Sequence, residues 1–324
     1  MDSPRQTFKT ARGHTYSLVH IPPRDSRRPT LLLLHGFPSH LHDWVHQTGY
    51  LAAHGYGVLA PDLLGYGQTD QPSCPDAYRL KLMSDDIADM VRALVMVAGH
   101  PKRSTLVGVG HDFGATLLSR AAAYYPELWH RLVFLAVGPP KLGTPFDVDS
   151  INHMTRQILG FELLGYIKWL ATDPQAATTL ESHAQAVMNL VFCADHGVWD
   201  EWYRPLGKMK EFCEQERRVA MGAWYTADLQ RQHLECFARP GGYRGATMWY
   251  TMWTDNLFAE DEKELQEFRI QTPTLFVGAE GFAQQRDLLA AWCEDLTCRE
   301  VDGGHWIHLE QAKRINTLIQ DFLE

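Results

Sequence analysis

Several features that identify large classes of protein are missing from this sequence. Its six cysteines are scattered and form no C-x-x-C pair, which argues against a zinc cage and against a disulfide framework in a chain of 324 residues. No H-E-x-x-H or comparable spacing occurs among its 16 histidines, so we expect neither a metal nor a cofactor. Apolar runs such as Leu31–Leu34 and Leu94–Ala98 fall far short of the roughly 20 residues that cross a bilayer.

Positive charge is also scarce, and the one basic cluster is the short group of Arg24, Arg27 and Arg28. The formal net charge of −9 would repel nucleic acid and an anionic membrane surface. The first residues are polar and contain no apolar stretch of the kind found in a signal peptide. We therefore expect a cytoplasmic protein that binds a small-molecule substrate, with no nucleic-acid or membrane partner, and a homodimer is open.

Hydrophobic residues make up 45% of the chain, which is enough apolar surface for a folded core. Through about residue 140, short apolar runs alternate with longer amphipathic segments, a pattern that predicts a doubly wound, mostly parallel α/β sheet. The expected strands are Thr30–Leu34, Gly57–Ala60, Ser104–Val109 and Arg131–Val137, with an irregular antiparallel edge in Arg5–His20. The expected helices lie around Trp44–His54, Met83–Val97 and Ala115–Tyr125.

The alternation stops at about Lys141, and the chain up to about Phe268 has a helical pattern that is rich in aromatic residues. Runs typical of strands return only at Pro273–Val277 and Arg299–Val301. Both ends of the helical block must return to one sheet. We therefore expect a helical cap of residues 141–268, inserted into a core of residues 1–140 and 269–324, with a small-molecule site between cap and core.

The segment Gly110-His-Asp-Phe-Gly114 follows a predicted strand and precedes a predicted helix. This is the G-x-Nu-x-G spacing of a nucleophile elbow, with Asp112 in the position of the nucleophile. Glycines suit such a turn because the nucleophile has a strained backbone and its neighbours must be small. Aspartate is also a favoured helix N-cap, which is the structural alternative for Asp112.

Two other turns supply the groups that a nucleophile needs. The strand Leu31–Leu34 ends in His35-Gly-Phe-Pro38, where the backbone N–H of Phe37 would join that of Phe113 in an oxyanion hole. Alone, this segment would be an ordinary Gly-Pro turn. His305 lies on a glycine-rich loop after the last expected strand, and it is the expected base because it follows the nucleophile in the chain.

Together, His35-Gly-Phe-Pro38, Gly110-His-Asp-Phe-Gly114, Pro61-Asp-Leu-Leu-Gly-Tyr-Gly-Gln-Thr-Asp70 and Gly304-His-Trp306 resemble the α/β-hydrolase fold, specifically its soluble epoxide hydrolase family. The resemblance covers essentially the whole chain. It implies that Tyr166 and Tyr250 of the cap hold the epoxide oxygen, although both would also serve as core aromatics.

The residue types suit the hydrolysis of an apolar or aromatic epoxide to a vicinal diol. A carboxylate at Asp112 would attack an epoxide carbon and become an alkyl ester, while the two tyrosines donate to the developing alkoxide. A water activated by His305 would then cleave the ester at its carbonyl, in the oxyanion hole.

The acid that normally orients the histidine in this family is missing from its usual place. After the penultimate expected strand the chain reads Gly278-Ala-Glu-Gly-Phe-Ala-Gln-Gln285, which puts Phe282 or Gly281 at the acid position. Glu280 lies one or two residues early and is the candidate third member of the triad. The other location that relatives use carries no carboxylate before Asp147.

Three other functions stay open. A haloalkane or haloacid dehalogenase would use the same nucleophile, but Phe113 and Ala115 stand where many dehalogenases carry a halide-holding tryptophan or arginines. A cyclase that opens an epoxide with the substrate's own hydroxyl would need no hydrolytic step. A non-catalytic ligand-binding relative would not need the missing acid.

Overall fold

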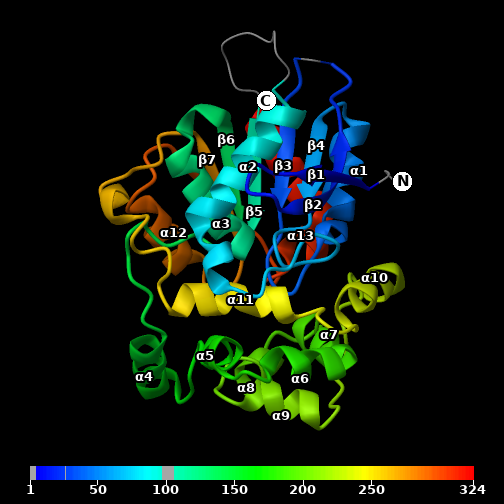
Figure 1. The fold of residues 1–324 in the computed structure, drawn as a ribbon, viewed down its shortest axis with the longest axis vertical. Helices are drawn as coiled ribbons and strands as arrows, with labels where there is room; N and C mark the ends of the chain where they lie inside the picture. Colours follow the sequence, from blue (N-terminus) through cyan, green and yellow to red (C-terminus); the bar gives the residue numbers. More distant parts are fainter. Residues whose placement is uncertain (1–4, 26, 97–105) are drawn as a thin grey trace.

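Eight strands form one sheet in the computed structural model, which describes residues 5–25, 27–96 and 106–324 (Figure 1). Their order across the sheet is β1-β2-β4-β3-β5-β6-β7-β8. The strands are β1 (Gln6–Lys9), β2 (Thr15–Ile21), β3 (Thr30–Leu34), β4 (Gly57–Pro61), β5 (Leu106–His111), β6 (Trp129–Leu135), β7 (Thr274–Gly278) and β8 (Leu296–Glu300). The pairs β1–β2 and β2–β4 are antiparallel and all the others are parallel, so the predicted mostly parallel sheet is confirmed.

Helices cover both faces of this sheet. Every residue of β3 is buried, and alternate residues face opposite layers, with Leu32 and Leu34 in one hydrophobic cluster and Leu31 and Leu33 in the other. Apolar residues of α2 and α3 join the first cluster, and those of α1 and α14 join the second. The core helices are α1 (Val45–Ala53), α2 (Leu80–Leu94), α3 (Phe113–Tyr124), α12 (Phe282–Ala290), α13 (Ile307–Glu310) and α14 (Ala312–Leu323).

The predicted core elements are found with small shifts at their ends. The helix expected at Ala115–Tyr125 begins at Phe113, because the elbow turns directly from strand to helix at Asp112. The last strand begins earlier than Arg299; it lies at the sheet edge and is only partly buried, so its pattern is less apolar. The first residues of the strand expected at Ser104–Val109 lie outside the described residues, as does the end of the helix expected at Met83–Val97.

The chain between β6 and β7 is helical and leaves the sheet (Figure 1). Figure 1 shows α11 lying between the sheet and the layer formed by α5 to α9. This insert contains α4 (Val148–Leu159), α5 (Gly165–Thr172), α6 (Ala176–Ser182), α7 (Ala184–Val191), α8 (Val198–Trp202), α9 (Lys208–Glu214), α10 (Ala227–Phe237) and α11 (Arg244–Thr254). Trp249 of α11 donates its indole N–H to the Leu64 carbonyl at 2.8 Å, which fastens the insert to the core.

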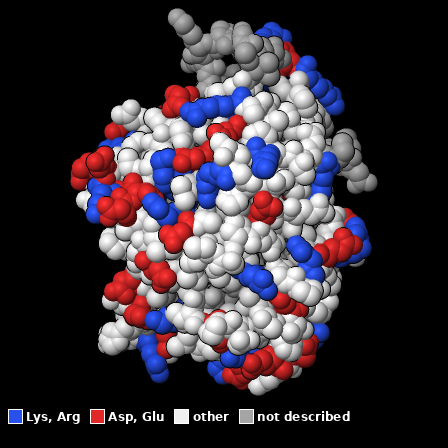
Figure 2. Space-filling view, viewed as in Figure 1, with Lys and Arg blue, Asp and Glu red and all other residues white. Residues whose placement is uncertain are grey.

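On the face shown in Figure 2, acidic and basic side chains are interspersed over both core and insert. Among the residues that the structure describes, no helix is both long and apolar enough to cross a membrane.

Candidate active site

Asp112 lies at the turn between β5 and α3 with a backbone φ of 55° and ψ of −126°. A positive φ is strained for a residue with a side chain and is common at functional sites. The turn closes only because its neighbours are small: a Cβ on Gly114 would overlap the Leu34 carbonyl, and one on Gly110 would lie 2.6 Å from Ala115 Cα. Asp112 makes no side-chain cap hydrogen bond to α3, so its carboxylate is not used as an N-cap.

The first predicted oxyanion donor contacts this carboxylate. The Phe37 N–H donates to Asp112 Oδ1 at 2.8 Å, and Gly36 leaves the room, since a Cβ there would overlap the same oxygen. Phe113 opens α3, so its backbone N–H is among those that have no partner within the helix. Its share in the oxyanion hole stays a prediction.

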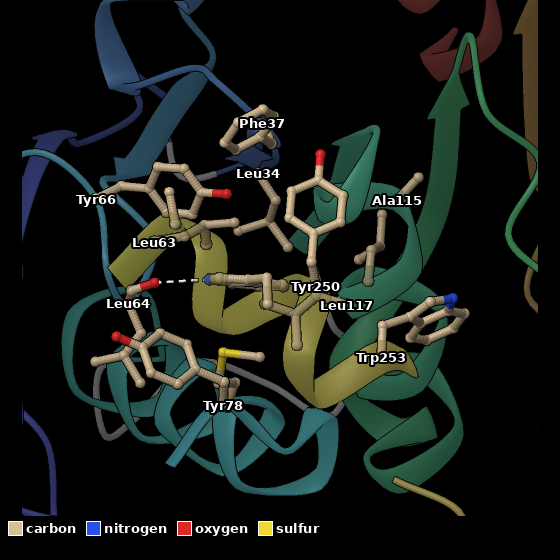
Figure 3. Close-up of a cluster of buried hydrophobic side chains, with 14 of the residues drawn as sticks. Leu34, Phe37, Leu63, Leu64, Tyr66, Tyr78, Ala115, Leu117, Tyr250 and Trp253 are labelled. Atoms are coloured by element: carbon tan, nitrogen blue, oxygen red, sulfur yellow. Dashed lines mark hydrogen bonds between the residues drawn. The ribbon is translucent and has the colours of Figure 1, made fainter. Parts of the chain in front are cut away.

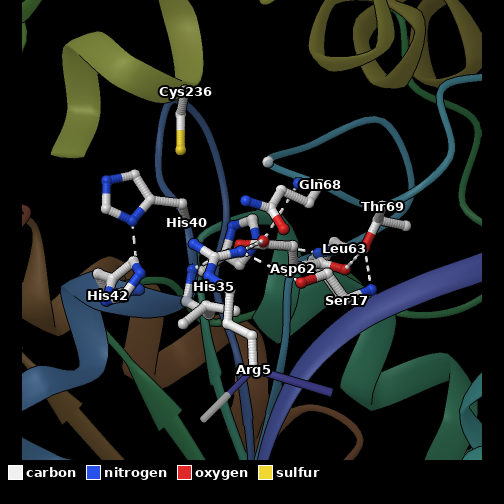
Figure 4. Close-up of polar contacts among 12 residues, drawn as sticks. Arg5, Ser17, His35, His40, His42, Asp62, Leu63, Gln68, Thr69 and Cys236 are labelled. Atoms are coloured by element: carbon white, nitrogen blue, oxygen red, sulfur yellow. Dashed lines mark hydrogen bonds and ion pairs between the residues drawn. The ribbon is translucent and has the colours of Figure 1, made fainter. Parts of the chain in front are cut away.

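A buried polar network fixes the loop that carries Phe37 (Figure 4). The Leu63 N–H donates to His35 Nε2 at 3.0 Å, so His35 Nδ1 carries the proton and donates to the Gly36 carbonyl at 3.0 Å. Burial lowers the pKa of His35, in agreement with a neutral ring. Asp62 accepts from the Leu41 N–H at 2.9 Å and pairs with Arg5 at 2.8 Å. The loop that presents the Phe37 N–H is therefore held before Phe37, at His35, and after it, at Leu41.

His305 lies on the loop between β8 and α13 and faces the nucleophile. Its Nε2 is 3.6 Å from Asp112 Oδ2, the carboxylate oxygen that Phe37 does not hold. Burial, together with nearby Arg204 and His196, lowers the pKa of His305 to about 3. The imidazole is therefore neutral at neutral pH and free to accept a proton, although it is a weak base.

The two predicted tyrosines come from the insert and lie over the elbow. Tyr250 packs edge-on against Phe37 (Figure 3), with ring centroids 5.0 Å apart. It packs in the same way against Phe113, also at 5.0 Å, and its ring lies 6.1 Å from that of Tyr166. Burial raises the pKa of Tyr166, and Asp112 adds to the shift. Burial also raises the pKa of Tyr250, with the neighbouring tyrosines and Asp112 contributing. Both hydroxyls are therefore protonated and able to donate.

Sequence reasoning missed two aromatic residues that complete this wall. Tyr203 packs on Tyr166 with ring centroids 4.4 Å apart. Trp199 stacks on Tyr203 at 4.8 Å and reaches His305 at 5.7 Å. These contacts form one aromatic series from Tyr166 to His305. The insert is rich in aromatic residues throughout, so nothing in the sequence distinguished these two.

The segment Pro61–Asp70 contributes Tyr66, a residue with no role predicted from the sequence. Its ring packs edge-on against His35 with centroids 4.9 Å apart, and its fully buried hydroxyl has no hydrogen-bond partner among the described residues. Figure 3 shows this hydroxyl pointing toward the side on which Tyr250 lies.

Glu280 is placed apart from the other predicted residues. It lies in the turn between β7 and α12, and its carboxylate pairs with Arg204 of the insert, which also pairs with Asp200. Within the described part of the chain, Asp112 is the one carboxylate in ion-pair range of His305. The structure thus brings Asp112 and His305 together, while Arg204 draws Glu280 to the insert.

The described residues contain no group of three or more His, Cys, Asp or Glu side chains that could hold a metal ion. A cavity of about 650 Å³ is lined by Arg5, Gln68 and Arg239 among others and does not include Asp112.

Comparisons with known proteins identify the family and the fold. Residues 29–312 match the family model described as alpha/beta hydrolase fold. Epoxide hydrolase srdG of Neurospora crassa is 29% identical over 315 residues, which cover 91% of this chain and 86% of the relative. Epoxide hydrolase B of Mycobacterium tuberculosis is 26% identical over 359 residues, which cover 96% of both chains.

Solved structures give the same picture of the fold. Epoxide hydrolase A from Mycobacterium thermoresistibile superposes with a TM-score of 0.80 at 23% identity, over 99% of this chain and 98% of that one. Potato epoxide hydrolase I superposes with a TM-score of 0.75 at 21% identity, over 99% of both. At these identities the likeness shows a shared fold.

Proposed function

The chain belongs to the alpha/beta hydrolase fold family, and from this premise we propose that it hydrolyses an apolar or aromatic epoxide to a vicinal diol through an ester on Asp112. One observation carries the proposal. The Asp112 carboxylate sits on a strained elbow with one oxygen held by the Phe37 N–H and the other facing His305, below two protonated tyrosines. The aromatic residues around the elbow favour an apolar substrate.

Ring opening uses the oxygen of Asp112 that the backbone leaves free. Oδ2 attacks an epoxide carbon, a C–O bond of the ring breaks, and the alkoxide takes a proton from Tyr166 or Tyr250. Oδ1 stays on the Phe37 N–H and becomes the carbonyl oxygen of the ester. The donor that orients the nucleophile is therefore already in place for the second step.

Ester cleavage again uses the Phe37 N–H and His305. Water attacks Asp112 Cγ, the negative charge develops on Oδ1 in the oxyanion hole, and His305 accepts the proton from water. The tetrahedral intermediate then expels the alkoxide, which takes the proton held by His305 and becomes the diol. The remaining proton of the water leaves the regenerated carboxyl group and returns to the tyrosinate left by ring opening, so that both the carboxylate and the tyrosine are restored. Asp112 is the one described carboxylate in ion-pair range of the imidazole, and it is esterified at this stage; because the pKa of His305 is also low, we expect this step to limit turnover.

Among the described residues, no carboxylate apart from that of the nucleophile lies in ion-pair range of His305, and this favours one alternative, opening of the epoxide by a hydroxyl of the same substrate. This reaction gives a cyclic ether and needs the tyrosine donors but no ester hydrolysis.

Intact-protein mass spectrometry after mixing with a panel of apolar and aromatic epoxides tests the proposal. We expect a covalent adduct with the mass of the epoxide, mapped to Asp112, and a diol product, with no halide released from haloalkanes or haloacids. A cyclic ether formed with no adduct on Asp112 would support the alternative. Turnover of none of these substrates, with no adduct, would contradict both.

A further inference from the structure

We propose that Glu310 is a positioning residue, which holds the backbone on both sides of His305 in a site where the nucleophile Asp112 is the one described carboxylate in ion-pair range of the imidazole. This inference rests on the proposed ester mechanism and names the residue that keeps the base in place for the second step.

Glu310 is the last residue of α13, and its side chain is only 7% exposed. Its Oε2 accepts from the Gly304 N–H at 2.8 Å and its Oε1 accepts from the Trp306 N–H at 3.0 Å. These two residues flank His305. One carboxylate therefore grips the chain on both sides of the base, through hydrogen bonds that its charge strengthens.

A third contact ties the same loop to the nucleophile strand. His111 Nε2 donates to the His305 carbonyl at 2.8 Å, and the two rings lie 4.5 Å apart. His111 directly precedes Asp112. Hydrogen bonds thus fix the backbone at Gly304, His305 and Trp306 in succession, and the bond to His305 comes from the neighbour of the nucleophile.

The insert also reaches this loop through His196. Its Nε2 lies 3.4 Å from Glu310 Oε2, and its ring rests on Gly304, where a Cβ would overlap it. The Trp306 indole N–H donates to the Val191 carbonyl at 3.0 Å, so the insert holds both sides of His305. Glu310 is the point at which the core helix, the histidine loop and the insert meet.

A backbone grip does only part of what an orienting acid does. An acid hydrogen-bonded to the imidazole selects its tautomer and favours its protonated form, whereas Glu310 fixes only where the ring is placed. Loss of Glu310 should therefore slow the step that needs an accurately placed base and spare the step that does not.

The test separates the two steps in single-turnover quench experiments on the full chain, followed by mass spectrometry of the Asp112 adduct. In Glu310→Gln the side-chain amide nitrogen cannot accept, so one flanking N–H loses its partner. We expect ester hydrolysis to fall by about 10²-fold, the scale of a misplacement near 1 Å, with the alkylation rate unchanged within a factor of about 2. Glu300→Gln, a change of the same charge on the exposed end of β8, should leave both steps at the native rate.

Native-rate ester hydrolysis in Glu310→Gln would overturn the inference, as would an equal loss in both steps, which marks a merely structural role. Absence of any Asp112 adduct in the native chain would instead contradict the proposed function. If Glu310→Gln does not fold, His196→Gln serves as the second variant. It should slow hydrolysis alone, and native rates for both steps in His196→Gln would then count against the inference.

Discussion

Asp112 is held by residues close to it in the sequence or in the adjacent strand, whereas His305 is held by residues from three separate parts of the chain. The elbow depends on small residues at Gly110 and Gly114 and on one N–H from the loop after β3. His305 depends on His111, 194 residues away, and on Glu310, which the insert contacts through His196. We infer that the turn that carries the nucleophile is built largely by local structure, whereas the placement of the base depends on tertiary packing.

The largest loss of activity is expected for Asp112→Asn, which removes the nucleophile from the locally built turn. A neutral amide is a far weaker nucleophile than a carboxylate, so we expect diol formation to fall by about 10⁴-fold or more and the covalent adduct to disappear. Turnover of an epoxide and intact mass give the result. Near-native turnover by freshly purified protein, with deamidation to Asp excluded by mass, would show that Asp112 is not the nucleophile.

Removal of the alkoxide donors should have the next largest effect. Tyr166→Phe and Tyr250→Phe should each slow alkylation by about 10²-fold, the usual loss for one donor to a developing oxyanion, and the double variant should nearly stop it. Single-turnover alkylation is the measurement. Native alkylation rates in both single variants would remove these tyrosines from the mechanism.

The lifetime of the Asp112 ester tests how well His305 acts as the base. Because His305 has a low pKa and no described carboxylate apart from that of the nucleophile in ion-pair range, we expect the native protein to consume about one equivalent of epoxide in a burst, as the Asp112 ester forms, and then to turn over at a slow steady rate. His305→Gln should lengthen the life of the ester by a further factor of about 10² and leave the burst intact. A native protein with no burst and no trapped ester would mean that its base is fully supported.

The same contrast explains what could be predicted from the sequence. The elbow, the Phe37 loop and the apolar strands are encoded by contiguous residues, and in the described part of the chain the structure places them near the expected positions, with shifts at the strand ends. Tyr203 was not predicted, because its place beside Tyr166 comes from packing between segments that are far apart in the chain. Glu310 was not predicted either; its two backbone partners are only 6 and 4 residues away, but the resemblance assigned no role to this position. Tyr166 and Tyr250 were found only through a family resemblance.

Glu280 shows the limit most clearly. Its position in the sequence, near that of the expected acid, suggests contact with His305. In the structure, however, its carboxylate pairs with Arg204 of the insert. No local pattern around Glu280 indicates that pairing.

The pH dependence of ester hydrolysis is expected to be small. A histidine with an ordinary pKa of about 6.5 would lose roughly 30-fold in its neutral form between neutral pH and pH 5. The pKa of His305 is lowered to about 3, so the ring stays neutral and hydrolysis should change by less than a factor of about 2 over that range. Single-turnover hydrolysis measured at each pH tests this, and a fall centred near pH 6.5 would contradict it.

The smallest effect is expected for Glu280→Gln. Because its carboxylate pairs with Arg204 at an exposed site, the variant should lose at most about 1 kcal/mol of stability and keep its ester hydrolysis within a factor of about 2 of native. Thermal unfolding and single-turnover hydrolysis measure the two quantities, with Glu300→Gln as the charge-matched control. If Glu280 instead orients His305, hydrolysis should fall by up to about 10⁴-fold, the loss caused by removing the aspartate of a serine triad. That result, together with no native burst, would mean that Glu280 completes the triad and that His305 is as well supported as Asp112.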